Sequence, residues 1–367
     1  MSSKLKFSVS TKDLRSTLDR LGSIPGAKSV IPMLRITSAM DGLTLTRVTP
    51  EATMRATTED SDIEGEGEVE VGFNSFSQLI GRAGANLIKV EEIGDKLIIQ
   101  SGSAKMSLLK TPPGTMPEPT EPDFECEAIE LPIVDLLNYF KIVAGSASRD
   151  AADSALLGVC ARAMFGGKLH FFATNRKSLH CVETPFSLPV DTLIPNEVVS
   201  AVQTAFEGLD TVATVSFHSN GLRVLTERAE LFASVSEGKP PNVQGFLDMV
   251  YSAEVVNSMT MDRAALADAL KAVAPVAAGS AKGVDLKLEL GQVILEARNG
   301  KDAEITVSVD ARTQGEGAIR FGADYLTGIL AAASGEEVTI RNAGQAIYIR
   351  QDDRSFTLAL MKAGQAE

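Results

Sequence analysis

Apolar and polar residues follow a helical period and then a strand period, and this succession occurs three times along the chain. Leu14, Leu18 and Leu21 form one apolar face at helical spacing, and equivalent spacing is found in 132–144 and 262–273. Each of these segments is expected to form an amphipathic helix that packs one face on a sheet.

A turn and a run of alternating residues, typical of a half-buried strand, follow each expected helix. The turns begin at Asp41, Gly166 and Gly291, which are 125 residues apart in both steps. A second helix then ends near a glycine, and a hairpin with a glycine turn completes each segment. These glycines are Gly84, Gly208 and Gly335 for the helix ends and Gly94, Gly221 and Gly344 for the hairpins. The pattern predicts three similar α+β domains that together use all 367 residues.

The domain boundaries are expected where the composition changes. Residues 111–123 (TPPGTMPEPTEPD) are rich in proline and acid and indicate a stiff, extended linker. A second Pro-containing loop, 238–246, leads toward the next boundary. We therefore predict domains at 1–123, 124–252 and 253–367.

Three such domains can be joined in series. Sheets that pair edge to edge form a curved outer wall with every helix on the concave side, and this pairing satisfies strand edges that would otherwise aggregate. Two chains related by a two-fold axis would close this arc into a ring of six domains. The predicted fold class is therefore α+β, with antiparallel sheets outside and helices lining the inside.

Charge and hydropathy narrow the function. Thirty-five Lys and Arg against 48 Asp and Glu give a net charge of −13, which excludes broad adhesion to nucleic acid or anionic membrane but not a local basic face. The chain has neither an apolar run of about 18 residues nor an N-terminal signal pattern, so a cytoplasmic protein without membrane contact is expected. Cys126, Cys160 and Cys181 are far apart, which indicates separate buried thiols.

The sequence contains no motif of a catalytic or cofactor site. HExxH, GxxxxGK[ST], GxSxG and a GxGxxG after a strand are all absent. His170, His180 and His218 occur singly, as surface or partly hydrogen-bonded residues do. One SxxK match, Ser236–Lys239, lies beside two prolines in an expected loop and is attributed to chance. We expect no enzyme, no cofactor and no metal.

The chain resembles the bacterial sliding clamp, the beta subunit of the DNA polymerase III holoenzyme, as a divergent member. The resemblance spans nearly the full length and is most specific at KSVIPML (28–34), ATNRKSL (173–179), SEGKPP (236–241) and LALM (358–361). It implies a non-catalytic homodimeric ring that encircles duplex DNA as a processivity factor. The implied partners are double-stranded DNA, a DNA polymerase catalytic subunit, a clamp-loading ATPase and other proteins with clamp-binding motifs.

The resemblance also implies which residues face the DNA. Lys28, Arg82 and Arg149 match positions of DNA contact, and the basic residues Arg15 and Lys282 accompany the expected helices. Asn196 and Glu197 stand where the family usually has basic residues, so weak and salt-sensitive contact is expected. The alternative for each basic residue is a solvated helix face.

A peptide-binding cleft is the second implied site. Matching positions are Leu156, Thr174, Leu179, Pro241, Phe246 and Met361, whereas Arg176, Lys177, Ser178 and Lys362 depart from the family pattern. We expect a cleft tuned to a different set of peptides, or else an ordinary inter-domain core.

The resemblance also implies that Met106, on an expected edge strand, and Val276, beside Pro275, meet where the dimer closes. The alternative for both is an ordinary core or edge residue. The alternative function is a scaffold or specialised paralogue of the same fold that binds peptides but has weakened DNA encirclement. Retention on circular but not on linearised DNA after loading distinguishes the two functions, since only a ring that encircles DNA slides off free ends.

Overall fold

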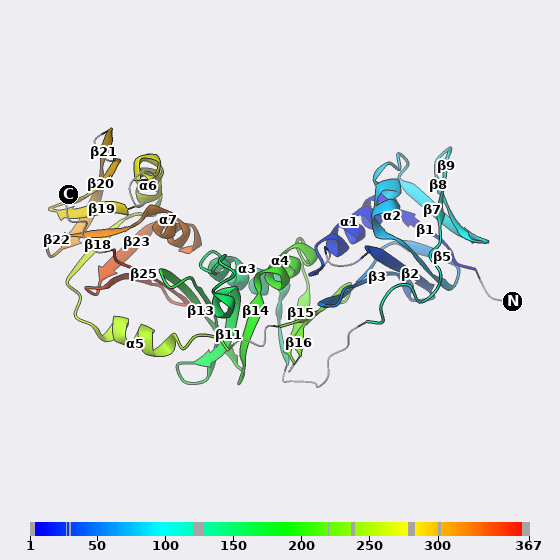
Figure 1. The fold of residues 1–367 in the computed structure, drawn as a ribbon, viewed down its shortest axis with the longest axis horizontal. Helices are drawn as coiled ribbons and strands as arrows, with labels where there is room; N and C mark the ends of the chain where they lie inside the picture. The colour runs from blue at the N-terminus through cyan, green and yellow to red at the C-terminus, as the bar shows by residue number, and fades with distance from the viewer. Residues whose placement is uncertain are drawn as a thin grey trace. The chain divides into compact units, whose positions relative to one another are not determined.

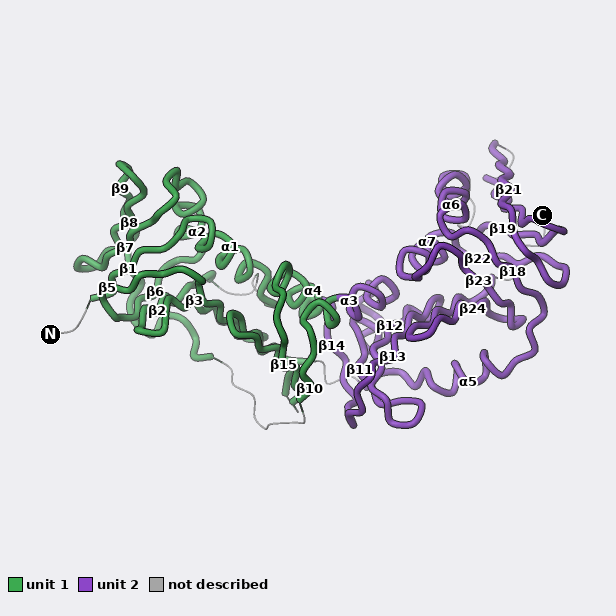
Figure 2. Tube along the Cα trace, turned by 180° about the vertical axis from the view of Figure 1, so that it is seen from behind, with its two compact units in different colours: residues 1–137, 197–236 green, residues 138–196, 237–367 purple. Residues whose placement is uncertain are grey.

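The computed structural model describes residues 4–26, 28, 31–119, 128–218, 220–235, 239–277, 283–299 and 302–361. The chain forms two compact units, which Figure 2 shows in different colours: unit 1 comprises 1–137 and 197–236, and unit 2 comprises 138–196 and 237–367. The middle third of the sequence therefore contributes to both units. The predicted boundaries of three domains remain a prediction.

Unit 1 consists mainly of antiparallel strands with two helices from the first third of the chain. Its elements there are β1 (Lys6–Ser10), α1 (Thr11–Gly22), β2 (Met33–Ala39), β3 (Gly42–Val48), β4 (Ala52–Thr57), β5 (Ser61–Gly65), β6 (Gly67–Gly72), α2 (Phe73–Gly81), β7 (Leu87–Ile93), β8 (Lys96–Ser101) and β9 (Ala104–Leu109). Later segments add β10 (Ala128–Pro132), α4 (Asn196–Ala205), whose first residue falls in unit 2, β15 (Val212–Phe217), β16 (Gly221–Leu225) and β17 (Ala229–Ser234).

Two sheets form unit 1, and one of them joins the first and middle thirds of the chain. The strand orders are β5-β1-β7-β8-β9 and β10-β15-β16-β17-β4-β3-β2-β6. The joint is the antiparallel β17–β4 pair, in which Leu231 lies opposite Met54 and both side chains are buried. Helix α1 packs against β1, β3 and β4, and α2 packs against β2, β6 and β9 (Figure 1). The predicted edge-to-edge joining is confirmed here.

Unit 2 holds most of the remaining elements. From the middle third come α3 (Ile133–Ala144), whose first turn falls in unit 1, a 3₁₀ turn (Ser154–Leu156), β11 (Gly158–Met164), β12 (Lys168–Thr174), β13 (Ser178–Ser187), β14 (Asp191–Pro195) and α5 (Gln244–Ser252). From the last third come β18 (Asn257–Asp262), α6 (Arg263–Ala277), β19 (Gly283–Glu289), β20 (Gln292–Asn299), β21 (Ala303–Gln314), β22 (Gly317–Gly322), α7 (Ala323–Ala332), β23 (Glu337–Asn342), β24 (Ala346–Arg350) and β25 (Arg354–Ala359).

One sheet of 12 strands runs through unit 2, in the order β14-β11-β12-β13-β25-β24-β23-β18-β21-β20-β19-β22. The middle and last thirds join at the β13–β25 pair, where His180 lies opposite Phe356 and the two rings meet edge to face. Helix α6 packs against β18 to β21, and α7 packs against β22 and β25 (Figure 1). The second joint is therefore also a pair of strands.

The predicted helices and turns agree closely with the structure. Leu14, Leu18 and Leu21 are buried on α1, as their spacing predicts. Helix α3 begins at Ile133, because Pro132 still belongs to β10, where it pairs with Val212. The α+β fold with antiparallel sheets is confirmed.

Helix α5 is the element that the sequence analysis missed. Its nine residues follow Pro240 and Pro241, and the proline pair suggested a loop over 238–246. Leu247 and Val250, three residues apart, are the two buried positions on this helix. A helix of about two turns buries too few residues to produce a clear periodic pattern.

The described part of the expected linker, 111–119, lies against unit 1. Met116 is buried in a cluster with Met33 and Val48. The backbone N–H groups of Thr115 and Met116 both donate to the same carboxylate oxygen of Glu70, at 3.1 and 3.0 Å. The beginning of this acidic, Pro-rich segment is therefore anchored to the first sheets.

Candidate functional site

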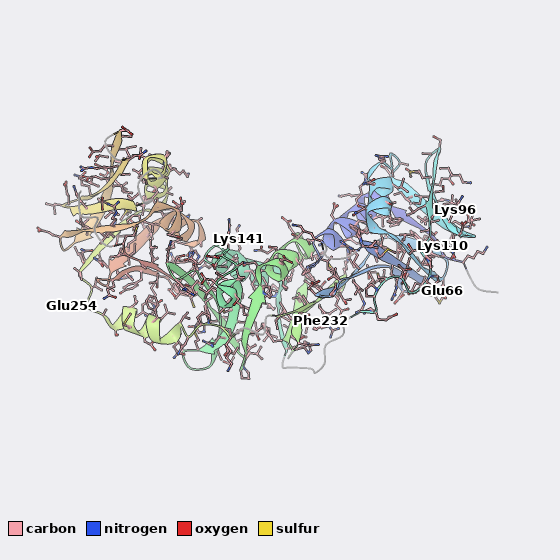
Figure 3. The ribbon with its side chains drawn as sticks, in the orientation of Figure 1. Glu66, Lys96, Lys110, Lys141, Phe232 and Glu254 are labelled. Atoms are coloured by element: carbon pink, nitrogen blue, oxygen red, sulfur yellow. The ribbon has the colours of Figure 1, made fainter. Side chains whose placement is uncertain are left out.

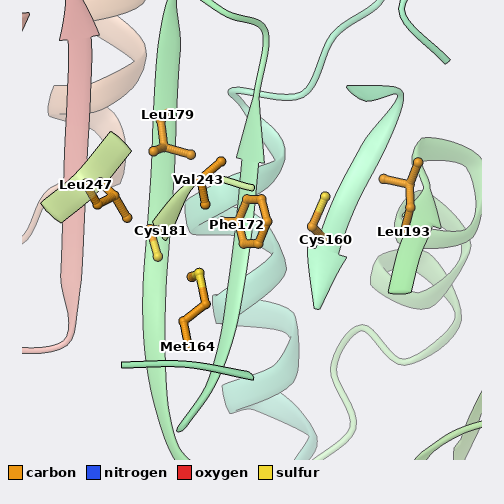
Figure 4. Packing of buried hydrophobic residues seen from close by; sticks show 8 residues of the cluster. All are labelled: Cys160, Met164, Phe172, Leu179, Cys181, Leu193, Val243 and Leu247. Atoms are coloured by element: carbon orange, nitrogen blue, oxygen red, sulfur yellow. The ribbon is translucent and has the colours of Figure 1, made fainter. Parts of the chain in front are cut away.

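An apolar cluster in unit 2 joins β11 to β14 with the start of α5 (Figure 4). Its buried members are Cys160, Met164, Phe172, Leu179, Cys181, Leu193, Val243 and Leu247. Because strand side chains alternate between faces, every second residue of these strands contributes to the same layer. The cluster holds α5 on the sheet and fixes Leu179, one of the predicted cleft residues.

The six residues that match the predicted cleft, together with Arg176 and Lys177, all lie in unit 2, with different exposures. Leu156 and Leu179 are buried and Pro241 is half-buried, whereas Phe246 is 39% and Met361 36% exposed. Buried positions support the sheet, and only the exposed ones offer apolar surface to a ligand. The cleft remains a prediction, and these exposures are compatible with it.

Contacts within unit 2 bring part of this set together. Thr174 lies opposite Leu179 in the β12–β13 pair. Ala359 lies two residues before Met361. Its backbone N–H donates to the Lys177 carbonyl oxygen at 2.8 Å. The end of β25 therefore runs beside the turn between β12 and β13. Phe246 lies on α5, outside this group of strands and turns.

Arg162, which the sequence analysis did not single out, positions the Pro240–Pro241 segment. Its guanidinium donates two hydrogen bonds to the Asp191 carboxylate, at 2.7 and 2.9 Å. The same group donates to the carbonyl oxygens of Pro241 at 2.8 Å and Pro240 at 3.1 Å. An arginine alternating on a strand gives no sequence signal for this role, because both partners are distant in the chain.

Side-chain hydrogen bonds fix the turn between β12 and β13. Asn175 Oδ1 accepts the backbone N–H groups of Lys177 (3.1 Å) and Ser178 (2.9 Å). Thr174 Oγ1 donates to the Ser178 carbonyl oxygen at 2.8 Å. Arg176 has a φ of +68°, which is costly for a residue with a Cβ. The turn is therefore held in one strained conformation that presents Arg176 and Lys177 to solvent.

A polar groove of about 590 Å³ lies between this turn, the 145–153 segment and α7. Arg176 Nη2 is 2.6 Å from an oxygen of Asp153 across it. Lys177 Nζ lies 5.7 Å from the centroid of the Tyr325 ring, within cation–π range. Three of the residues that depart from the family pattern, Arg176, Lys177 and Ser178, therefore line this groove.

The predicted isolated thiols are confirmed for two cysteines. Cys160 and Cys181 are buried and free, and burial raises the pKa of both thiols to about 12. A thiol with so high a pKa holds almost no thiolate at neutral pH, so neither is a ready nucleophile. Cys126 lies outside the described residues.

The three histidines are buried and each ring has a hydrogen-bond partner, which agrees with the second of the two expected environments, surface or partly hydrogen-bonded. His170 Nδ1 lies 2.8 Å from the Lys168 carbonyl oxygen, and His180 Nδ1 lies 2.9 Å from that of Ile142. His218 Nε2 lies 2.9 Å from the Ser216 hydroxyl oxygen. Burial lowers the pKa of His180, so its ring is neutral in the folded protein at neutral pH. Within the described ranges, no group of three or more potential metal ligands occurs.

Several arginine side chains donate hydrogen bonds to the backbone carbonyl oxygens at the C-terminal ends of helices. Arg15, a predicted DNA-facing residue, donates to Ile80, Gly81 and Ala83 at the end of α2, with the shortest distance, 2.7 Å, to Ala83. Arg20 donates to Ala205, the last residue of α4, at 2.7 Å. Positive charge is favourable at helix C-termini, where the carbonyl groups lack partners. These guanidinium groups are therefore already engaged in unit 1.

Helices α7 and α1 also have an arginine at their carbonyl ends. Arg263 donates to the Leu330 carbonyl oxygen on α7 at 3.0 Å, and buried Arg47 donates to Leu21 on α1 at 2.8 Å. Sequence spacing does not reveal these bonds, because each arginine and its helix end are 26 to 67 residues apart.

The remaining predicted DNA-facing residues are placed as follows. Lys28, Arg82 and Arg149 are exposed, and Lys282 lies outside the described residues. Lys141, on α3, is exposed as well (Figure 3). Asn196 donates from its side chain to the Ser148 carbonyl oxygen at 3.1 Å, a structural bond in unit 2. Of the predicted DNA-facing residues that the structure describes, Lys28, Arg82 and Arg149 are therefore the ones that are exposed.

Of the two predicted dimer residues, Met106 lies on β9 and Val276 on α6, and in the described part of the chain β9 has an unpaired strand edge. Met106 is half-buried on β9, an edge strand that pairs only with β8. Val276 is half-buried near the end of α6. In β21, pairing with β18 covers only Ala311–Gln314, so the strand has a second edge without a partner over 303–310.

No helix among the described residues is long and apolar enough to cross a lipid bilayer. Residues 250–361 match the family model of the DNA polymerase III beta subunit, C-terminal domain. A comparison by sequence with curated proteins finds no match.

Solved structures similar to this chain cover almost its whole length. The DNA polymerase III beta subunit from Thermotoga maritima has a TM-score of 0.85 at 18% identity, over 98% of this chain and 100% of that one. The beta sliding clamp from C. crescentus has a TM-score of 0.88 at 17% identity, over 99% and 100%. A sliding clamp from Pseudomonas aeruginosa, bound to griselimycin, has a TM-score of 0.86 at 17% identity, over 98% and 100%. The chain thus has the fold of the bacterial sliding clamps, and its last third matches the C-terminal domain of the DNA polymerase III beta subunit.

Proposed function

We propose that this protein is a DNA sliding clamp, a processivity factor that encircles duplex DNA and tethers a replicative DNA polymerase. The observation that carries the proposal is the agreement in fold with solved clamps over 98–99% of the chain, together with the family match of residues 250–361. Tethering acts by topology: a polymerase that releases the template stays at high effective concentration beside it. No step of this function requires a catalytic centre, cofactor or metal.

The ring of this proposal is a homodimer. In the part of the chain that the structure describes, strands β9 and β21 each have an edge without a partner, and unpaired edges are strongly disposed to pair. Met106 on β9 and Ile305 and Val307 on β21 are half-buried, so each edge offers apolar side chains next to free backbone groups. Pairing of β9 with β21 of a second chain would bring Met106 toward Val276. A native mass of about twice 38.9 kDa is expected, and a mass of 38.9 kDa at micromolar concentration would contradict it.

The test of encirclement uses DNA topology. The protein is loaded by a clamp-loading ATPase and ATP onto nicked circular DNA, and the complex is isolated before and after the circle is linearised. We expect retention on the circle and loss within minutes from the linear form, because a ring slides off free ends. Equal retention on both forms, or none on either, would refute the proposal.

A second candidate is a scaffold of the same fold that binds partner proteins but holds DNA weakly. The motivating observation is that Arg15, Arg20 and Arg263 bind helix ends, while Asn196 and Glu197 stand at positions where basic residues were expected. The same topological experiment separates the two functions, since a scaffold shows no preference for circular DNA.

The proposed partners are double-stranded DNA, a polymerase catalytic subunit, a clamp loader and other proteins with short clamp-binding motifs, all in the cytoplasm. Short peptides would bind at the predicted cleft, with exposed Phe246 and Met361 as apolar contacts. Methionine suits several ligands because its unbranched side chain adapts in shape.

A further inference from the structure

Two consecutive prolines, Pro240 and Pro241, precede α5. Proline has no backbone N–H, so this dipeptide can be held by backbone hydrogen bonds only through its carbonyl oxygens. Arg162 on β11 reaches both of them: Nη1 lies 2.8 Å from the Pro241 oxygen and Nη2 lies 3.1 Å from the Pro240 oxygen. One guanidinium therefore binds two successive carbonyl groups of a dipeptide that has no backbone donor of its own.

Asp191 on β14 sets the orientation of this guanidinium. Arg162 and Asp191 lie opposite each other in the β11–β14 pair. Nε and Nη2 donate to the two carboxylate oxygens at 2.7 and 2.9 Å, a bidentate geometry that fixes the plane of the guanidinium. The Arg162 side chain is only 18% exposed, so these bonds are better protected from water than those of a fully exposed pair. The donors that bind the proline carbonyls are therefore aimed at them in the free protein.

The other end of the same segment is held by apolar contacts. Val243 and Leu247 belong to the buried cluster beneath α5 (Figure 4). The cluster and the guanidinium together hold residues 240–247 on the sheet of unit 2. Two predicted cleft residues, Pro241 and Phe246, come from this stretch. Arg162 therefore supports one wall of the predicted cleft without being one of its predicted peptide contacts.

The segment that carries Met361 also meets a charged cross-strand pair. Asp285 lies opposite Arg320 in the β19–β22 pair, and Arg320 Nη1 is 2.9 Å from Asp285 Oδ2. The Met361 N–H donates to the Arg320 carbonyl oxygen at 2.8 Å. Strand β19 begins at Gly283 and β11 at Gly158, 125 residues apart, which is the spacing of the predicted repeats. Two equivalent strands thus each carry one member of a charged pair beside a segment predicted to form the cleft.

We propose that the Arg162–Asp191 pair positions one wall of the peptide cleft and keeps this wall in place in the free protein. The inference rests on the proposed function, because it requires a peptide that binds beside Pro241. Arg162 acts through the prolines and is therefore a positioning residue. Without it, the wall is in place in only a fraction of the molecules, and the apparent Kd rises by the inverse of that fraction.

Positioning has a kinetic signature that a direct contact lacks. If the wall moves in and out of place rapidly, the association rate constant falls by the fraction of molecules in which it is in place, and the dissociation rate constant stays the same. Loss of a side chain that touches the peptide acts mainly on dissociation. The two rate constants therefore distinguish a positioning residue from a contact residue.

The test uses the full-length protein and a fluorescein-labelled peptide with leucine and phenylalanine anchors, followed by stopped-flow anisotropy. Arg162→Met removes all four hydrogen bonds and keeps an unbranched apolar stem. Its Kd should rise about ten-fold through slower association, with the dissociation rate constant within about two-fold of the original. Arg162→Lys retains the charge but not the planar fork, so its Kd should rise about three-fold.

Lys287→Met is the matched control. Lys287 Nζ pairs with Glu296 at 2.7 Å on the same sheet, so the variant removes an ion pair of unit 2 but leaves the bonds of Arg162 intact. Its rate constants should equal those of the unmodified protein. Asp191→Asn is a second test variant that serves if Arg162→Met fails to fold. It weakens the support of the guanidinium and should slow association about three-fold.

A further measurement needs no peptide. Hydrogen exchange of the free protein, read by mass spectrometry, reports on the backbone N–H groups of residues 242–252. Arg162→Met should exchange several-fold faster there, because local opening becomes easier when the proline carbonyls are released. Lys287→Met should leave this exchange unchanged.

The outcomes separate this proposal from the proposed function. Unchanged rate constants for Arg162→Met, with or without faster exchange, would show that the pair does not position the wall, and the cleft would stand. A raised dissociation rate constant with unchanged association would make Arg162 a contact residue and would equally overturn the proposal. If the unmodified protein binds no such peptide, the cleft and the positioning role fall together.

Discussion

The guanidinium of Arg47 lies 4.0 Å from the centroid of the Phe73 ring, at the point where the first residue of α2 meets β3. The same group donates to the Leu21 carbonyl oxygen at 2.8 Å and so also binds the end of α1. Arg47 is buried, and burial lowers its pKa to about 10. A single side chain therefore links two helices and a strand of unit 1.

Replacing Arg47 with alanine should destabilise unit 1. The change leaves a buried carbonyl oxygen without its donor and a cavity beside Phe73, and these effects together cost about 3 kcal/mol. Urea unfolding followed by circular dichroism measures this loss. Arg312→Ala is the control, because Arg312 is an exposed strand residue whose ion pair with Glu337 is screened by solvent and should contribute little to stability. Similar losses for the two variants would contradict the role of Arg47.

Arg15 and Arg82 should respond in opposite ways to the same substitution. Arg15→Gln removes charged hydrogen bonds to the end of α2, so stability should fall by about 1–3 kcal/mol with little change in DNA binding. Arg82→Gln removes an exposed charge, so stability should stay within about 0.5 kcal/mol. The slope of log K against log salt should then decrease in magnitude by about 0.9. The measurements are urea unfolding and DNA binding over a salt series; a changed slope for Arg15→Gln would show that it contacts phosphate.

Arg176→Gly should be more stable than Arg176→Ala, although glycine usually destabilises. Both variants lose the exposed ion pair with Asp153, but only glycine adopts a φ of +68° without steric cost. The expected difference in unfolding free energy is about 1 kcal/mol, read from thermal or urea unfolding. An alanine variant as stable as the glycine variant would mean that the turn changes conformation when Arg176 is replaced.

The free energy of unfolding should decrease as pH falls below 6.5, and His180 should account for part of this decrease. Burial lowers the pKa of this ring in the folded state from 6.5, so the unfolded chain binds a proton that the folded protein rejects. Unfolding then takes up protons, and the free energy of unfolding falls with decreasing pH by at most about 1.4 kcal/mol per unit for one group. His180→Gln keeps a donor for Ile142 but cannot titrate, so the variant should have a smaller slope between pH 6.5 and 5.5. Equal slopes would contradict this assignment.

Met361→Asp should weaken peptide binding at least ten-fold without changing the native mass. Met361 is 36% exposed, so aspartate is tolerated in the free protein but places a charge where an apolar anchor would bind. Met40→Asp provides the control, because Met40 is 93% exposed in unit 1 and far in sequence from the predicted cleft. Unchanged affinity of Met361→Asp in anisotropy titrations would remove this residue from the cleft.

The periodic segments were accessible from the sequence because their signals are local. Leu14, Leu18 and Leu21 lie within three turns of one helix, and a glycine with positive φ marks the turn at Gly94 or Gly291. Helix α5 escaped detection because its two buried residues follow a pair of prolines. The buried positions of His170, His180 and His218 also escaped it, since each ring depends on strands that pair far along the chain.

For the candidate sites, too, the sequence identified some residues, and the structure alone showed their contacts. The sequence identified Arg176 and Lys177 as departures, yet only the structure placed Lys177 over Tyr325 and Arg176 against Asp153. Likewise, the sequence located Arg15 on the helix but could not reveal that its guanidinium binds the end of another helix. A side chain's partner is decided by which distant segment folds beside it.

By itself, the sequence determined three successive sets of helices and strands, because hydrophobic period and turn residues act over a few positions. Only the tertiary structure decided that β4 pairs with β17 and β13 with β25, and which arginines bind helix ends instead of facing solvent. Strand register and hydrogen-bond partners depend on groups up to 185 residues apart, and no local pattern encodes their meeting.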